Sequence, residues 1–536
     1  MFDTILLIGS GALLASALIY VIKYPWRALA LVNLPKYRKN YKENAYVKEN
    51  AFIGQPPRSV TIPSYADVKD QLPQPIWEGH EDAIRCYDKA WQIAFENIHN
   101  PGENSGMISP YMDAAFNDHL FMWDSCFMLM FGRYAAKLFP FQETLDNFYA
   151  LQHADGFICR EIAEKDGKDI FAPYDHCSTG PNVMPWCEYE HYQFHGDVDR
   201  VKRVFPALLA YHQWLRANRT WPHGGYWANG WSCGMDNMPR LKNKNLLASY
   251  FSNGHMIWAD ISMQQLLSCN VLIDMAKLCG RSQDVADLEA ERNQLRALIN
   301  EKLWDDHTNF YYDLWANGKH SGVKSIGAYW ALMAQAVPQK HLSAFVAHLS
   351  DPKEFNRPNR IPTLSADNEF YCRDGNYWRG AIWAPTNYMV LKGLETYGCN
   401  DLAFEIATCA LDNVVQTFCE TGTLFENYAP EYAGKGNIAK GDFVGWSGIF
   451  PICTLLEFVF GLKWNGWRKE LVWNVSLTDR FGVDRFPLGN HGTAKILCHK
   501  RENTQDRPQI EISSDMDFTL ILQWNGHEEK IQIQAN

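Results

Sequence analysis

The sequence predicts a mainly α-helical protein in which six helical hairpins close into a ring, followed by a small β module. Between Ala83 and about Leu462, apolar residues recur mainly at helical spacing, in twelve candidate helices. Long loops rich in Gly, Pro and aromatic residues separate these segments. Loops of about 20 to 30 residues are unusual in compact domains unless they carry function. After Trp464 the chain changes to short apolar runs between turn residues, which is typical of strands.

The composition limits the classes of function. Fifty basic and 61 acidic side chains among 536 residues leave a net charge of −11, which argues against a nucleic-acid partner. The 20 Trp, 25 Tyr and 29 Phe residues offer faces that can stack on sugar rings, although most belong to the core of a chain this long. The 14 Cys include no C-x-x-C pair and are expected to be mostly reduced, buried thiols.

The N-terminal segment, residues 1–22, is predicted to be an uncleaved membrane anchor. The run Ile5–Ile22 contains no charged residue, and its eighteen residues reach the lower limit for a membrane span. A cleaved signal peptide is the rival interpretation, but only Asp3 and no basic residue precedes the run. Basic residues follow it, which favours a cytoplasmic location for the rest of the chain, with a lumenal or extracytoplasmic location as the alternative. They are Lys23, Arg27, Lys36, Arg38, Lys39 and Lys42.

The remaining chain divides into a connector at residues 23–80, a helical domain at residues 81–463 and a β module at residues 464–536. Prolines between Gln55 and Pro75 predict an extended connector, so a chain starting at Gln55 is expected to be soluble and active. The twelve helices are predicted to begin near Ala83, Trp123, Phe141, Asn182, Asp199, His255, Gln283, Lys324, Gln339, Arg379, Asp401 and Ser447. Strands are predicted at Leu471–Trp473, Ala494–Leu497, Gln509–Ile512, Phe518–Leu522 and Lys530–Ile533.

Two loop carboxyl groups are the candidate catalytic residues. Asp236 lies in the aromatic stretch Tyr226–Arg240, where Tyr226, Trp227 and Trp231 are expected to surround it. A carboxyl group held against aromatic surface has a raised pKa, which suits a proton donor. Glu426 lies in a second such loop. Hydrolysis of a glycosidic bond needs one carboxyl group to protonate the leaving oxygen and another to activate water or attack the sugar. The pattern therefore predicts a glycosidase.

Six stretches in order along the chain resemble motifs of glycoside hydrolase family 63 and its mannosylglycerate-hydrolase-like relatives. They are Met122–Ser125, Asp155–Glu161, Gly234–Arg240, Tyr377–Trp383, Phe425–Tyr428 and Gly445–Gly448. The resemblance implies an (α/α)6 barrel and inversion at the anomeric carbon, with Asp236 as general acid and Glu426 as general base. Many members carry a large β domain before the barrel, where this chain has only the anchor and the connector. The implied substrate is an α-glucoside, an α-mannoside or a compound of the mannosylglycerate type.

Further residues of these stretches are predicted to bind the sugar. Asp124, Arg160 and Glu161 would grip hydroxyl groups through charge-assisted hydrogen bonds, although core packing and a surface ion pair are the plainer alternatives. Arg379 is expected to hold a carboxylate or a sugar hydroxyl group. The complete predicted substrate-binding set is Trp123, Asp124, Arg160, Glu161, Trp231, Arg240, Trp378, Arg379, Trp383, Tyr428 and Trp446.

No metal or cofactor is predicted. Cys187, His191 and His195 share one face of a predicted helix, but they lack the short paired spacings of zinc motifs, so core and helix-face roles are favoured. A Gly-rich phosphate loop after a strand and the pattern Gly-x-Ser-x-Gly are both absent from the sequence, which gives no support to a nucleotide enzyme or a serine hydrolase. Two alternatives remain, namely another sugar enzyme on the same barrel (an isomerase, lyase or phosphorylase) and a carbohydrate-binding protein without turnover.

Overall fold

The computed structural model describes residues 30–242 and 246–535, and of residues 246 and 247 it describes the backbone alone. The membrane anchor predicted at residues 1–22 lies outside the described residues. Among those that are described, no helix has the length and apolar character needed to cross a membrane.

Helices begin close to all twelve predicted positions. The major ones are α5 (Glu81–Glu96), α6 (Met122–Gly132), α7 (Thr144–Ala150), α8 (Met184–His195), α9 (Val198–Asn218), α12 (Ala259–Cys279), α13 (Ala286–Leu298), α14 (Trp330–Met333), α15 (Gln339–Ala347), α16 (Ala384–Thr396), α17 (Asn400–Thr421) and the π-helix η11 (Phe450–Val459) after the turn η10 (Ser447–Ile449). The helices without a predicted counterpart are α3 (Leu34–Asn40), α4 (Tyr65–Val68), α10 (Gly230–Cys233) and α11 (Leu246–Phe251). The α14 helix begins at Trp330, after the turn η8 (Ile326–Tyr329), rather than near Lys324. The α16 helix begins at Ala384 rather than near Arg379, with Pro385 in its first turn, where no backbone N–H is needed.

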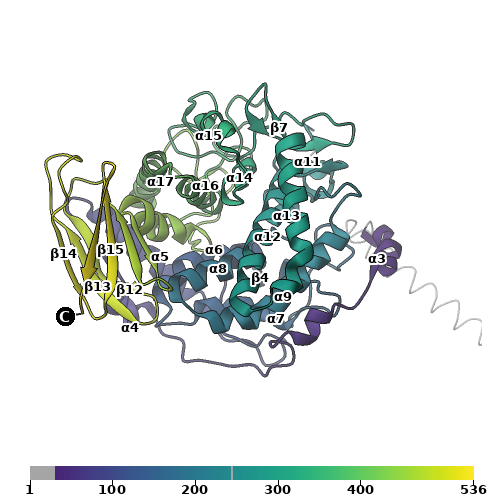
Figure 1. Cartoon of the computed structure of the whole chain (residues 1–536), viewed down its shortest axis with the longest axis horizontal. Coiled ribbons are helices and arrows are strands. Elements are labelled where there is room, and N and C mark those ends of the chain that lie inside the picture. The colour runs from purple at the N-terminus through teal and green to yellow at the C-terminus, as the bar shows by residue number, and fades with distance from the viewer. Residues whose placement is uncertain (1–29, 243–245, 536) are drawn as a thin grey trace, which may run out of the picture.

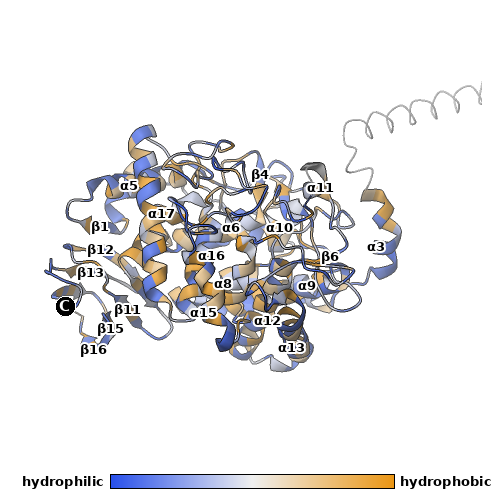
Figure 2. Ribbon diagram, turned by 90° about the horizontal axis from the view of Figure 1, so that it is seen from above, coloured by the Kyte–Doolittle hydropathy of each residue, from blue (hydrophilic) through white to orange (hydrophobic). Residues whose placement is uncertain are grey.

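Six of these segments contact one another in a closed ring. The contacts run from α6 to α8, α12, α14 and α16, and then through η10 and η11 back to α6. Every residue of α6 and of η11 is buried, as expected for helices in which most residues are apolar. The other helices lie outside the ring, and α13 buries only Leu288, Glu291 and Leu295. Figure 2 shows the mixed hydrophilic and hydrophobic colouring of the outer helices α5 and α17.

The C-terminal β module consists of two four-stranded sheets at the end of the molecule opposite α3 (Figure 1). Its strands are β10 (Leu462–Asn465), β11 (Glu470–Asn474), β12 (Phe481–Leu488), β13 (Gly492–Cys498), β14 (Ile510–Ser514), β15 (Phe518–Trp524) and β16 (His527–Ile533). Strand β11 pairs in parallel with β15, although β12, β13 and β14 lie between these two strands in the sequence. All five predicted strands are present, whereas β10 and β12 were not predicted. Gly482 and Pro487 interrupt the apolar pattern of β12.

Parts of the segment predicted as an extended connector pack on the rest of the fold. Strand β1 (Gln74–Trp77) completes one sheet of the β module by pairing antiparallel with β12. Earlier in the connector, Phe52 is completely buried, and Asn50 Nδ2 donates to the carbonyl oxygen of Tyr149 and to Gln152 Oε1, each at 2.9 Å. The chain between α3 and β1 therefore contacts both the helical domain and the β module.

All fourteen cysteines are free thiols. Burial raises the pKa of several of them, for example to about 12 for Cys159. Because the thiolate is the reactive form, these buried thiols are protonated and unreactive at neutral pH. Their role in the fold is that of small apolar side chains.

Candidate active site

One cavity of about 870 Å³ brings together residues from five separate parts of the chain. Its walls come from the segments before the inner helices α6, α8, α12, α16 and η10, together with the first residues of α6. The residues of such loops can vary without disturbing the helical ring, and binding and catalytic residues are therefore often found in them. The lining residues are Phe116, Asn117, Phe121, Trp123, Asp124, Arg160, Glu161, Ile170, Phe171, Gly180, Pro181, Trp231, Gly234, Asp236, Asn237, Tyr250, Asn376, Tyr377, Trp378, Glu426, Ile438, Ala439, Lys440 and Trp446.

Nine of the thirteen predicted site residues line this cavity. They are Trp123, Asp124, Arg160, Glu161, Trp231, Asp236, Trp378, Glu426 and Trp446. Three carboxyl groups of the cavity have raised pKa values, namely those of Asp124, Asp236 and Glu426. These three groups do not form a metal ligand set among themselves.

Asp236 is carried by a tight local fold. The side chain of Asn229 caps α10 by accepting a hydrogen bond from Ser232 N at 2.9 Å, and Gly234 ends the helix in the left-handed conformation with φ of +75°. A Cβ atom at Gly230 would lie 2.1 Å from the carbonyl oxygen of Asp236, so only glycine permits this close return of the chain. Burial raises the pKa of Asp236 to about 7, with Arg160 opposing the shift and Glu426 adding to it.

Glu426 enters the cavity from a different loop and is 3% exposed. The hydroxyl group of Tyr377 donates to its Oε1 at 3.1 Å, and the backbone N–H of Lys440 donates to its Oε2 at 3.3 Å. Its own carbonyl oxygen accepts from Trp446 Nε1 at 3.0 Å. Burial raises the pKa of Glu426 to about 7, while the two donors and the positive charge of Lys440 favour the ionised form.

The third carboxyl group, Asp124, lies at the start of α6. Burial raises its pKa well above the usual range, and the neighbouring charge of Glu426 adds to the shift. Arg160 is held by Glu161, with Nη2 3.1 Å from Oε2, and its guanidinium group lies over the rings of Phe171 and Trp231. This wall therefore offers a neutral carboxyl group and an ion pair beside aromatic faces, which suits hydrogen bonding to sugar hydroxyl groups.

Four predicted substrate-binding residues do not line the cavity. Arg240 is buried and forms ion pairs with Asp260 and with Asp313, the latter at 3.0 Å, so its charge is satisfied behind the wall. Trp383 is completely buried and stacks on Trp378 with the ring centroids 3.9 Å apart.

The side chains of the other two residues, Tyr428 and Arg379, also contact protein groups. Tyr428 is completely buried, and its hydroxyl oxygen accepts from Phe425 N at 3.2 Å. Arg379 Nε donates to the carbonyl oxygen of Asn237 at 3.4 Å, beside the ring of Phe370. Both belong to stretches that resemble family 63 motifs, which made them candidates, but neither is among the residues that line the cavity.

The three aromatic residues expected around Asp236 differ in their relation to the cavity. Trp231 lines the cavity with Asp236, whereas Tyr226 and Trp227 do not. The hydroxyl group of Tyr226 donates to Glu291, and Trp227 packs on His176 with ring centroids 4.6 Å apart.

Several cavity residues were not predicted as site residues. Asn237 and Tyr377 lie inside stretches that the sequence had already singled out, so the motifs contained a signal for them. Lys440, Tyr250 and Phe116 lie outside every such stretch. Lys440 Nζ donates to the carbonyl oxygens of Ala115 and Phe116, which ties its loop to the opposite rim. That contact between distant loops has no local sequence pattern.

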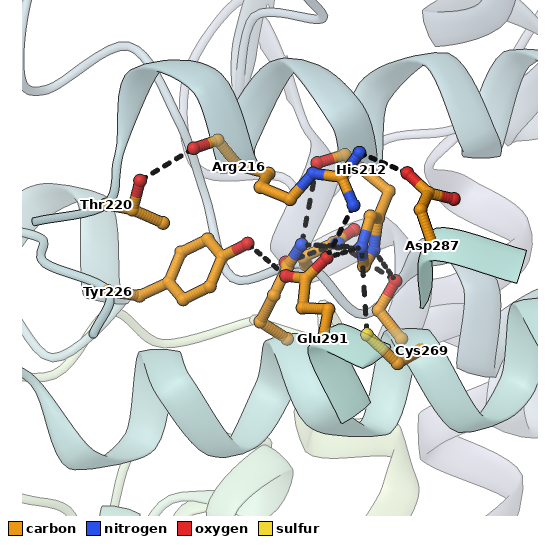
Figure 3. Close-up of polar contacts among 10 residues, drawn as sticks. His212, Arg216, Thr220, Tyr226, Cys269, Asp287 and Glu291 are labelled. Atoms are coloured by element: carbon orange, nitrogen blue, oxygen red, sulfur yellow. Dashed lines mark hydrogen bonds and ion pairs between the residues drawn. The ribbon is translucent and has the colours of Figure 1, made fainter. Parts of the chain in front are cut away.

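One group of described residues has the composition of a metal site, away from the cavity. Ligand atoms of His212, Cys269 and Glu291 lie within 4.8 Å of one another between α9, α12 and α13 (Figure 3). Glu291 Oε2 already faces His212 Nε2 at 3.2 Å and Arg216 Nη1 at 3.1 Å, while Tyr226 donates to Oε1. The charges are thus balanced by protein groups, and the network joins α9 to the helices packed against it.

The helix face of Cys187, His191 and His195 holds two buried histidines instead of a complete ligand set. Cys187 Sγ donates to the carbonyl oxygen of Cys126 at 3.5 Å, and the rings of His191 and His195 lie 4.4 Å apart. Burial, Arg133, His491 and Lys137 lower the pKa of His195 to about 3.

Acidification is therefore expected to destabilise the fold through His195. Its pKa is about 3 when folded, against about 6.5 when unfolded, so the unfolded chain binds more protons in this window. The contribution of His195 to the free energy of unfolding should be fully present above pH ~6.5 and should be lost as the pH falls towards ~3. His195→Gln should reduce this fall in urea-unfolding free energy between pH 7 and 5, whereas His223→Gln, at an exposed position, should not. An equal pH slope for parent and His195→Gln would contradict this prediction.

Comparisons with known proteins identify the family. A family model described as "Mannosylglycerate hydrolase MGH1-like glycoside hydrolase domain" matches residues 117–447. A mannosylglycerate hydrolase of Thermus thermophilus is 24% identical over 397 residues, covering 62% of this chain and 92% of the relative. A probable mannosyl-oligosaccharide glucosidase of Schizosaccharomyces pombe is 24% identical over 288 residues, covering 47% of this chain and 34% of the relative. The chain thus spans about a third of that yeast protein.

The fold comparison agrees with the sequence comparison. The crystal structure of a family 63 mannosylglycerate hydrolase from Thermus thermophilus in complex with glucose is similar, with a TM-score of 0.55 and 20% identity, covering 69% of this chain and all of that one. The predicted resemblance to family 63 and the predicted glycosidase class are thereby confirmed. The chain belongs to the family of mannosylglycerate hydrolase MGH1-like glycoside hydrolases.

Proposed function

We propose that this glycoside hydrolase cleaves an α-glycosidic bond with inversion, using Asp236 as general acid and Glu426 as general base. The observation that carries the proposal is the presence of both carboxyl groups, from separate loops, in one cavity walled by Trp231, Trp378 and Trp446. An inverting mechanism requires one protonated and one ionised carboxyl group on opposite faces of the sugar.

The hydrogen bonds support this division of roles. Two donors, the Tyr377 hydroxyl group and the Lys440 N–H, stabilise the charged form of Glu426, as a base requires. The pKa of Asp236 is raised by burial and by the negative charge of Glu426, which favours its protonated form. The ionised base therefore helps to keep the acid protonated.

The proposed mechanism proceeds in one displacement. Asp236 gives its proton to the departing glycosidic oxygen while Glu426 removes a proton from water that attacks the anomeric carbon from the opposite side. Asp124, Glu161 and Arg160 would bind the hydroxyl groups of the sugar that lies between them. The closed ring of inner segments supports an (α/α)6 barrel as the scaffold, with α5, α7, α9, α13, α15 and α17 as the outer members of the six hairpins.

The pH dependence of kcat/KM is expected to be a narrow bell centred near pH 7. Activity should fall below this pH as Glu426 gains a proton, and fall above it as Asp236 loses its proton, because both have pKa values of about 7. The two groups interact, so the two limbs report the pair as a unit. A profile from pH 4 to 10 tests this, and a rate that rises steadily beyond pH 9 would contradict an acid with this pKa.

The sugar is proposed to be an α-glucoside, an α-mannoside or a mannosylglycerate-type compound. The names of the relatives support these three classes, and the cavity of about 870 Å³ is large enough for a disaccharide. Assay of the purified protein against a panel of all three classes, with release of the free sugar as the signal, selects among them. Absence of hydrolysis with isomerised, eliminated or phosphorolysed product would favour another sugar reaction on the same barrel.

The membrane association is likewise a proposal. The charge-free run of residues 5–22 and the basic residues that follow it support an N-terminal anchor with a cytoplasmic catalytic domain.

A further inference from the structure

The residue after the proposed acid, Asn237, is connected to the loop that faces the proposed base. Asn237 is 3% exposed, and its side chain makes two bonds to that loop. Nδ2 donates to the carbonyl oxygen of Asn376 at 3.0 Å, and Oδ1 accepts from the N–H of Trp378 at 2.8 Å. The amide thus bonds the backbone on both sides of Tyr377.

The dipeptide Asn376–Tyr377 has an unusual backbone conformation. Both residues have positive φ, +37° and +64°, which is costly for a residue with a bulky side chain and persists only where the surroundings hold it. Besides Asn237, Asn437 Oδ1 accepts from Asn376 N at 2.7 Å, and Trp383 Nε1 donates to the carbonyl oxygen of Tyr377 at 3.1 Å. Strain of this kind, held by several bonds, occurs often at functional sites.

This conformation directs the Tyr377 side chain towards Glu426. The hydroxyl group donates to Glu426 Oε1 at 3.1 Å, and the ring packs edge-on against Trp383 with centroids 4.9 Å apart. The other charged or titratable groups that influence or face Glu426 are Lys440, Asp236 and Asp124. Among these groups, Tyr377 is the one whose backbone neighbours are bonded by Asn237, and Asn237 belongs to the loop of Asp236.

We propose that Asn237 and Tyr377 are positioning residues that couple the two catalytic carboxyl groups. Asn237 holds the loop of Tyr377, and Tyr377 holds the Glu426 carboxylate in its ionised form at a set distance from Asp236. The inference rests on the proposed function, because it assigns a role to these residues through the acid and the base. It explains why a strained dipeptide is kept beside the cavity.

Removal of one hydroxyl group tests the link to the base. A hydrogen bond donated to a carboxylate lowers its pKa, so Tyr377→Phe should move the acidic limb of the kcat profile upward by about one pH unit. On that limb kcat should fall about tenfold, since one pKa unit changes the ionised fraction about tenfold, while KM and the alkaline limb stay nearly unchanged. Tyr371→Phe is the matched control, because the Tyr371 hydroxyl group donates to Glu431 at 2.7 Å outside the cavity.

A double-variant cycle tests the link through Asn237. Asn237→Ala removes two of the hydrogen bonds that hold the Asn376–Tyr377 dipeptide and should shift the acidic limb in the same direction as Tyr377→Phe. The variant with both changes should shift it no further, because the two residues act through one hydrogen bond. Additive shifts, or an unmoved limb in Tyr377→Phe, would overturn the proposal. If Asn237→Ala does not fold, the position of the acidic limb in Tyr377→Phe alone still tests the proposal.

Failure of the proposed function gives a different result. If Glu426 is not the base, Glu426→Gln retains activity, and the roles assigned above have no basis. If Glu426→Gln is inactive while Tyr377→Phe keeps the parent's acidic limb, the catalytic pair stands and the positioning inference alone is wrong.

Discussion

Asp236→Asn and Glu426→Gln should each lower turnover at least ~10²-fold while substrate binding largely survives. Both changes keep the size and shape of the side chain but remove its proton chemistry. Without the acid the leaving oxygen departs unprotonated, and without the base the attacking water keeps its proton. Turnover of the best panel substrate measured against calorimetric binding to each variant separates the two effects.

Matched controls make this result specific. Glu420→Gln, at an exposed position six residues before Glu426, should keep the parent's turnover. Proton NMR of the first anomer released by the parent enzyme tests the stereochemistry, and the carboxyl groups of an inverting pair should lie about 6.5–9.5 Å apart. A product that keeps the substrate's anomeric configuration would reject inversion, and near-full activity of Glu426→Gln would remove that residue from the mechanism.

The second large effect is expected from truncation of the N-terminal segment. A chain that starts at Gln55 loses Phe52, which is completely buried, and Asn50, which bonds Tyr149 and Gln152. Loss of a buried Phe side chain alone typically costs about 3–5 kcal/mol, so the truncated chain should be less stable by at least that amount. Urea unfolding, compared with a chain that starts at Ala30, measures the difference. Equal stability of the two chains would contradict the packing of this segment.

The chain that starts at Ala30 also tests the membrane proposal. The full-length protein should remain in the membrane fraction after a carbonate wash, whereas the shorter chain should be soluble and active. Recovery of a mature protein beginning after Tyr20 would replace the anchor with a cleaved signal peptide. Removal of the helical domain by protease added to intact cells would contradict the proposed cytoplasmic orientation.

Much of the fold follows from local sequence patterns. Helical spacing of apolar residues predicted all twelve major helices, because a buried helix face repeats its apolar residues within one or two turns. Period-two runs predicted five strands of the β module for the same reason. The candidate catalytic residues could be predicted from sequence motifs, because Asp236 and Glu426 lie in short stretches with an unusual combination of residue types.

The tertiary structure decided the features that depend on distant partners. Strand β1 pairs with β12 across about 400 residues, and Tyr377 reaches Glu426 across 49, and neither contact leaves a periodic pattern in the chain. Arg240 and Trp383 were expected at the site because they belong to stretches that resemble family 63 motifs, but Asp313 and Trp378 hold them behind the cavity wall. The sequence by itself determined which segments form helices and which loops carry reactive groups. The packing of those loops decided which side chains share the cavity, because that depends on contacts between residues far apart in the chain.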